Sequence, residues 1–190
     1  MEDMTTLIKA LRSRFGITDI REQREDLTFL SVPKDRVIPL LTHLRDHEGF
    51  SSFILLTAVD WMEEEVFQLT YMLNNPEEKH NLGIRTQISR EEPVMESAHH
   101  LWEHVATFQR ELKEMFGIVF PGSPHLNEEF LLEGWDNLPP MRRDFDTKKY
   151  SEETYFPRPG RKTKDPAEHM KEKLYPNEPR PQRASQKGDD

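Results

Sequence analysis

The sequence predicts an α+β fold, in which an antiparallel or mixed sheet carries helices on one face and is followed by an extended C-terminal tail. Apolar residues recur at helical spacing in three segments, and apolar or β-branched residues dominate four shorter segments between them. The last part of the chain is rich in proline and charge. We therefore expect an α+β domain over residues 1–145 and a tail over residues 146–190.

The first half of the domain is expected to contain two helices. Met4 to Phe15 has apolar residues at helical spacing and is followed by Gly16, a common helix stop. Leu27 to Val32 is typical of a strand, and Lys34 to His47 again has helical spacing. The expected element order is α-β-β-α-β-β-β-α, although the pattern locates only one of the first two strands.

The second half of the domain is expected to contain three consecutive strands and one long helix. The strands are Ser52 to Trp61, Val66 to Leu73 and about Asn81 to Ile88, with a turn at residues 74–76. The helix is expected to begin at Ser97, a good N-cap, and to run to about Met115 before Gly117. This order favours an antiparallel sheet with helices on one face.

The tail differs from the domain in composition. From residue 157 to the end there are nine basic and six acidic residues, whereas the rest of the chain has 17 basic and 29 acidic residues. Six of the 14 prolines lie in this tail, and its large apolar side chains are only Met170, Leu174 and Tyr175. Such a segment cannot bury enough surface to offset its ordering entropy, so we expect it to be disordered or extended in the free chain.

Composition excludes several classes of function. The chain has no cysteine, which excludes thiolate-held iron–sulfur clusters, cysteine zinc sites and disulfides. The net charge of -9 argues against general nucleic-acid binding. No glycine-rich phosphate-binding motif occurs, and the longest apolar run, Phe53 to Ala58, is far shorter than the ~20 residues that span a bilayer. The N-terminus has neither a signal-peptide nor a transit-peptide pattern, so we expect a soluble chain.

One local motif suggests a metal site. Residues 100–104 read His-Leu-Trp-Glu-His, the H-x-x-E-H pattern of inverted zinc peptidases. On a helix, His100 and His104 would lie one turn apart and could share a metal, with Glu103 as a base. The polar face of an amphipathic helix explains the same three letters. A soluble zinc hydrolase using His100 and His104 is therefore an alternative function, and the expectation is that these histidines hold no metal.

Three segments carry a combination of motifs in a fixed order. Leu56 to Trp61 is a strand-like run that ends in an aspartate and an aromatic residue, residues 109–120 read QRELKEMFGIVF, and residues 139–145 read PPMRRDF. Together they resemble the 30 kDa subunit family of respiratory complex I, whose signature contains E-R-E, G-I-x-F and P-L-R-K-D-F. The chain departs from that pattern at Gln109, where the family has glutamate, and at residues 122–128, where two family arginines are missing.

The resemblance implies a non-catalytic structural subunit in the peripheral arm of a complex I-like, membrane-attached respiratory oxidoreductase. It implies that this chain holds no cofactor and that iron–sulfur clusters lie in partner subunits. The implied partners are a hydrogenase-like large subunit and a cluster-bearing small subunit, with peripheral membrane contact on the cytoplasmic side only through the complex. The equivalent subunit of a membrane-bound nickel–iron hydrogenase, or of a ferredoxin-linked sulfur-reducing relative, is an alternative within this class.

A subunit interface is expected where the charged and aromatic residues of the motifs and the apolar residues of the tail gather. Arginine and aromatic side chains are the usual anchors of protein interfaces. The charged residues are expected either to face the large subunit or to brace the segment that does. The expected interface residues are Arg110, Glu111, Phe116, Arg142, Arg143, Asp144, Phe145, Met170, Leu174 and Tyr175.

Overall fold

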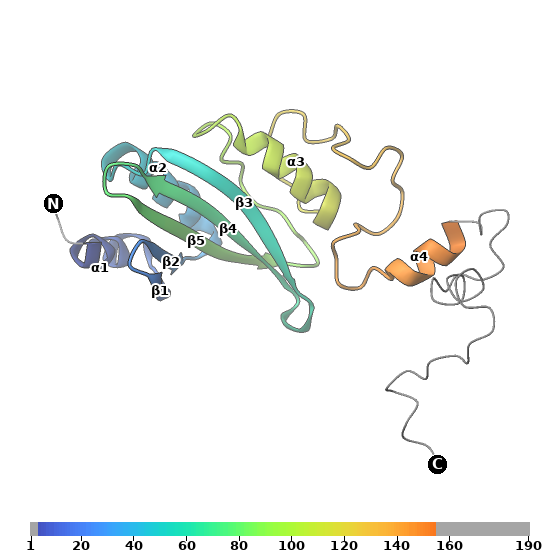
Figure 1. The fold of residues 1–190 in the computed structure, drawn as a ribbon, viewed down its shortest axis with the longest axis horizontal. Coiled ribbons are helices and arrows are strands. Elements are labelled where there is room, and N and C mark those ends of the chain that lie inside the picture. Colours follow the sequence, from blue (N-terminus) through green and yellow to red (C-terminus); the bar gives the residue numbers. More distant parts are fainter. Residues whose placement is uncertain (1–3, 155–190) are drawn as a thin grey trace, which may run out of the picture. The chain divides into compact units, whose positions relative to one another are not determined.

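A computed structural model describes residues 4–154 of the chain (Figure 1). It confirms the α+β fold and the element order α-β-β-α-β-β-β-α up to the end of the third helix. The chain divides into two units, Met1–Phe145 and Asp146–Asp190, which are described separately. The predicted tail anchors Met170, Leu174 and Tyr175 lie outside the described residues, so the assignment of domain and tail stays a prediction.

The sheet is mixed and has five strands in the order β1-β2-β5-β4-β3. All neighbouring strands are antiparallel except β2 and β5, which are parallel. The strands are β1 (Asp19–Arg24), β2 (Leu27–Ser31), β3 (Ser52–Trp61), β4 (Val66–Asn75) and β5 (His80–Ser89). The sequence pattern did not locate β1 because this edge strand buries none of its side chains fully and so shows no apolar period.

The predicted turn at residues 74–76 begins later in the structure. Asn74 and Asn75 still belong to β4 and pair with Asn81 and His80 of β5. The Asn75 side-chain oxygen then accepts hydrogen bonds from the backbone N–H groups of Glu77 and Glu78, both at 3.1 Å. Asparagine therefore closes the turn from the end of the strand, as Asx turns do.

The three helices of the first unit pack on one face of the sheet. Along β4 the side chains of Phe67, Leu69, Tyr71 and Leu73 are buried, whereas the alternating side chains are mostly only half-buried. The buried side chains join those of α1 (Met4–Phe15), α2 (Val37–His47) and α3 (Val105–Phe116) in one hydrophobic core. This is the arrangement expected for an amphipathic sheet packed on one side.

The third helix begins at Val105, not at Ser97 as predicted. Residues 97–104 form irregular backbone and turns, and their side chains make tertiary contacts in place of a helical cap. The Ser97 hydroxyl donates to the Gln109 side-chain oxygen at 2.7 Å, and the Trp102 indole donates to the Ser51 carbonyl at 2.8 Å. The predicted stop is confirmed, since Gly117 ends α3 with a φ of 78°.

In the second unit, the structure describes one helix, α4 (Thr147–Thr154), which the sequence analysis did not predict. The Asp146 carboxylate accepts a hydrogen bond from the Lys149 backbone N–H at 2.9 Å, which is the geometry of an N-cap. A side-chain cap therefore supports a short helix in a segment of low apolar content.

Candidate partner-binding segment

The candidate site is the irregular stretch of residues 121–145, which we call the connecting segment. It follows residues 117–120, which come after α3, and contains turns and bends but no helix or strand (Figure 1). Side chains of α3 hold the middle of the segment. The end of α3 and the end of the sheet hold its last part.

Glu114 of α3 fixes the middle of the connecting segment. Its carboxylate accepts three backbone hydrogen bonds, from the N–H groups of Phe130 at 2.6 Å, Leu131 at 2.8 Å and Leu132 at 3.1 Å. Hydrogen bonds to an ionised carboxylate are about twice as strong as neutral ones. The backbone at Leu131 is therefore held in one conformation, although the Leu131 side chain is 70% exposed.

Arg110, a predicted interface residue, also braces this segment. Its guanidinium lies 5.4 Å from the centre of the Phe130 ring and 3.7 Å from the Glu128 carboxylate. The structure gives the side chain of Glu111, the next predicted residue, no hydrogen bond or ion pair with any described residue and leaves Glu111 half-buried. Arg110 is therefore engaged within the chain, and the role predicted for Glu111 stays a prediction.

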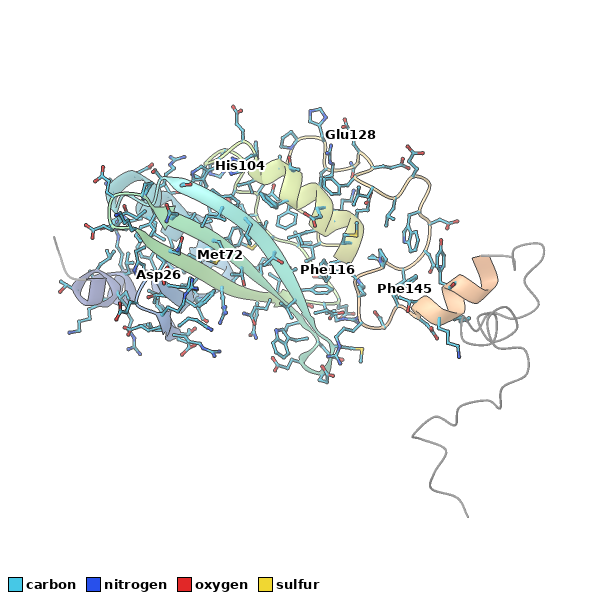
Figure 2. All side chains as sticks on the ribbon, in the orientation of Figure 1. Asp26, Met72, His104, Phe116, Glu128 and Phe145 are labelled. Carbon is cyan, nitrogen blue, oxygen red and sulfur yellow. The ribbon has the colours of Figure 1, made fainter. Side chains whose placement is uncertain are left out.

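Arg142 fixes the returning end of the connecting segment against the end of α3. Its Nε donates to the Phe116 carbonyl at 2.7 Å, and its guanidinium lies 5.3 Å from the centre of the Phe67 ring. The Phe116 ring packs edge-on against the same Phe67 ring at 5.9 Å, and the Met141 N–H donates to the Met115 carbonyl at 3.0 Å. Figure 2 shows Phe116 at the C-terminal end of α3, where this contact forms.

A buried carboxylate ties the next residues to the sheet. Asp60, at the end of β3, has a side chain that is only 2% exposed and accepts hydrogen bonds from Arg90 at 2.9 and 3.2 Å. It also accepts the backbone N–H of Arg143 at 2.9 Å. Arg90 donates to Asp144 at 2.6 Å, and the exposed Arg143 guanidinium contacts Glu63. We call Asp60, Arg90, Arg143, Asp144 and Glu63 the Asp60 cluster.

The electrostatics of the Asp60 cluster favour its charged form. Burial by itself would raise the pKa of Asp60, but hydrogen bonds from Arg90 and the Arg143 N–H, with the charges of Arg90 and Arg142, hold it below its ordinary value. The hydrogen bonds to Asp60 and Asp144 raise the pKa of Arg90 despite its burial. Both groups are therefore ionised at neutral pH.

Several of the predicted interface residues make contacts within the chain. Arg110, Phe116 and Arg142 make internal contacts, and the Phe145 ring packs against Trp135 with its centre 5.6 Å away. The connecting segment also carries two strongly exposed apolar side chains that the sequence analysis did not select, Leu131 at 70% and Met141 at 58%.

The alternative of a zinc site requires His100 and His104 to lie on one helix, and the structure has no helix at these residues. His100 lies in a turn, and His104 only precedes α3, with its Nε2 3.2 Å from the Phe53 carbonyl oxygen (Figure 2). Within residues 4–154, no group of three His, Cys, Asp or Glu side chains is placed to hold a metal ion. The geometric basis for sharing a metal between these two histidines is therefore gone, and the expectation that they bind none stays a prediction.

Fold and contacts together define an α+β domain whose charged side chains fix a long surface segment. A family model described as "Respiratory-chain NADH dehydrogenase, 30 Kd subunit" matches residues 30–151, which contain the Asp60 cluster and the connecting segment. The chain belongs to this family and is a subunit of a complex I-like respiratory oxidoreductase.

Individual relatives agree with this assignment. The C subunit of the NADH-quinone oxidoreductase of Moorella thermoacetica is 30% identical over 142 residues, which cover 75% of this chain and 95% of that protein. The second C/D subunit of the NADH-quinone oxidoreductase of Aquifex aeolicus is 33% identical over 115 residues, which cover 60% of this chain and 19% of that longer protein. A chain from the archaeal membrane-bound sulfane sulfur reductase shares the fold, with a TM-score of 0.76, 23% identity, and coverage of 86% of this chain and 98% of that one.

Within residues 4–154, no helix has the length and apolar character needed to cross a membrane.

Proposed function

We propose that this chain is a non-catalytic structural subunit of the peripheral arm and that its connecting segment docks on the hydrogenase-like large subunit. The observation that carries the proposal is the fixed presentation of Leu131 and Met141. Exposed apolar side chains are common when mobile, but here Glu114 and the Met115 carbonyl hold the backbone of each. Burying a leucine or methionine side chain contributes about 1.5–3 kcal/mol, so two prepositioned anchors are well suited to an interface.

The Aquifex relative supports a neighbouring large subunit. Its name joins C and D in one chain, and the stretch similar to this chain is only a part of it. Joining two proteins covalently is favourable when they work side by side. The lack of cysteine supports the further proposal that the redox centres belong to partner subunits, including a cluster-bearing small subunit. The proposal also includes contact with the membrane only through the complex, on the cytoplasmic side.

Pull-down of the tagged subunit from native membranes tests the docking surface. Leu131→Asp places an unpaired charge at the proposed contact, so we expect recovery of the large subunit to fall at least about tenfold while the free subunit keeps its melting temperature. Leu131→Met, which conserves the apolar volume, should retain recovery. Ile54→Asp is the matched control, because Ile54 is an exposed apolar residue of β3, at 43%, outside the connecting segment.

Equal recovery of the large subunit with Leu131→Asp and with the unchanged chain would contradict the proposed docking surface. The same purification separates the two branches of the family. A co-purified large subunit with two cysteine pairs for a nickel–iron centre would indicate a membrane-bound hydrogenase, and a large subunit without them would indicate a quinone-linked or sulfur-linked complex.

A further inference from the structure

The face of the sheet opposite the helices contains a polar hollow that the connecting segment does not use. The hollow has a volume of about 460 Å³ and lies where β1, β2, β5 and β4 are neighbours. Its lining includes Thr18, Asp19, Ser31, Gln68, Arg85 and Gln87. Hydroxyl and amide groups of this kind can bond the backbone of an extended peptide, and Arg85 supplies a cation.

Arg85 is held in position by an aromatic platform. Its guanidinium carbon lies 3.8 Å from the centre of the Phe29 ring. Phe29 lies across Gly83, its register partner on β5, and an added Cβ at Gly83 would come within 2.3 Å of that ring. Glycine is therefore required for the ring to lie flat, and the stacked ring limits the freedom of the guanidinium.

Arg85 lacks the partner that its burial calls for. Its Nε is buried and makes no hydrogen bond within the described residues. Burial and the nearby Arg21 lower its pKa, and Asp19 opposes them. Among the described residues Asp19 makes no ion pair with Arg85. The side chains of Arg21, Arg85 and Asp19 together carry one net positive charge, in a domain that is otherwise acidic. The two terminal guanidinium nitrogens also make no hydrogen bond within the described residues but are not buried, so a carboxylate entering the hollow can bind them.

The hollow continues into an exposed apolar surface. Gln68, part of its lining, accepts a hydrogen bond from the Trp61 indole at 3.0 Å. Trp61 and Val59, on the same face of β3, are 42% and 46% exposed. Arg85 and Trp61 are thus linked through Gln68, and arginine and tryptophan are the residue types enriched at interface hot spots. The extent of this surface favours a protein segment over a small anion.

We propose that this outer sheet face binds an extended, acidic segment of a second partner subunit, with one of its carboxylates on Arg85. The inference rests on the proposed membership of a multi-subunit complex but not on the connecting segment as a docking site. The two surfaces belong to different parts of the domain, so a single chain can hold two partners in register.

The absence of cysteine in the chain makes accessibility a direct test. The variants Gln87→Cys and Leu131→Cys report on the two surfaces, and Lys9→Cys, at an exposed position of α1, controls for reagent reactivity. Maleimide labelling of the Gln87→Cys variant should slow at least about tenfold in the assembled complex relative to the free subunit. Protection of the thiol in Leu131→Cys with unchanged labelling of Gln87→Cys would overturn this inference and leave the proposed function standing.

A zero-length cross-link identifies the occupant. In Arg85→Lys, a carbodiimide activates a neighbouring carboxylate, the introduced amine displaces the activated oxygen, and an amide bond forms as the urea leaves. Mass spectrometry of the assembled complex should find the introduced lysine joined to an Asp or Glu of another subunit. Cross-links only to Asp19, to residues 157–190, or to a second copy of this chain, or no cross-link at all, would each overturn the proposal.

Discussion

At the scale of single residues, Asp60 is a buried charged side chain that joins the sheet to the connecting segment. It is buried at the end of β3 and binds both the Arg90 guanidinium and the backbone of Arg143. Arg90 in turn binds Asp144, so a chain of ionic contacts links the sheet to the last residues of the first unit. Breaking such a buried arrangement is costly because the remaining charge loses its compensation.

We expect Asp60→Asn to lower the free energy of unfolding by about 3 kcal/mol, the lower end of the range for losing one partner of a buried pair, because Asp144 still accepts from Arg90. Urea unfolding at neutral pH provides the measurement. Glu63→Gln is the control, since Glu63 is 61% exposed and such surface pairs contribute about 0–1 kcal/mol. Equal effects of the two changes would show that burial of Asp60 does not matter.

The pH dependence of stability follows from the same carboxylate. The folded-state pKa of Asp60 lies below its unfolded value of about 3.9, so its stabilising effect is complete above about pH 4 and is lost as pH falls through the folded pKa. The difference in unfolding free energy between the unchanged chain and Asp60→Asn should therefore shrink on acidification. Urea titrations at a series of pH values measure it, and a difference that is constant down to about pH 2 would refute the assignment.

At the scale of elements, α3 connects the core to the connecting segment. Its buried side, including Leu112 and Phe116, packs in the core, while Arg110 and Glu114 hold the segment. Gly117, at the end of α3, has two roles. Its positive φ terminates the helix, and its lack of a side chain makes room for the connecting segment. An added Cβ there would lie 3.0 Å from an Arg142 guanidinium nitrogen and 3.3 Å from the Pro139 Cγ.

Gly117→Ala should therefore destabilise the domain more than Gly122→Ala. Both glycines have similar positive φ, 78° and 82°, so each change costs about 1–2 kcal/mol for the left-handed conformation. Only Gly117 adds the contact with Arg142, since nothing lies within 4 Å of the Cβ position at Gly122. Urea unfolding of the two variants isolates the contact, and equal losses would indicate that Arg142 moves aside without cost.

At the scale of the whole molecule, the chain combines a folded acidic domain with a basic C-terminal segment, 157–190, outside the described residues. The proposed docking surfaces both belong to the first unit, and the predicted anchors Met170, Leu174 and Tyr175 would add a third contact. Linked contacts raise the overall affinity because the second and third form at high effective concentration.

Deletion of residues 157–190 is therefore expected to leave the unfolding free energy of the rest nearly unchanged and to weaken assembly. The buried core residues among those that the structure describes end at Phe120, and Leu126 packs against them, so the deletion removes none of them and stability should persist. Pull-down of the large subunit by the truncated chain, compared with the full chain, measures the effect. Full recovery would show that the tail contributes nothing to assembly, and loss of cooperative unfolding would show that it belongs to the domain.

The sequence alone determined the elements whose apolar period is strong. Strand β3 and helix α1 have the predicted bounds, and Gly117 is the predicted stop, because burial of one face imposes a local repeat on the residues. The motifs at Asp60, Arg110 and Arg142 also identified the family. Local pattern could not locate β1, whose side chains are exposed, or the start of α3, where Ser97 bonds Gln109 instead of capping a helix.

Only the tertiary structure decided what the motif residues do. Spacing cannot show that Arg142 donates a hydrogen bond to the Phe116 carbonyl, or that Glu114 accepts hydrogen bonds from the three backbone N–H groups of residues 130–132. Nor can it show that Arg85 stacks on Phe29 across Gly83. These contacts join residues that are distant in the chain or on different strands, and their geometry depends on how the packed sheet and helix place them. A sequence repeat records which face of an element is buried, whereas the partner of each polar group is set by the assembled fold.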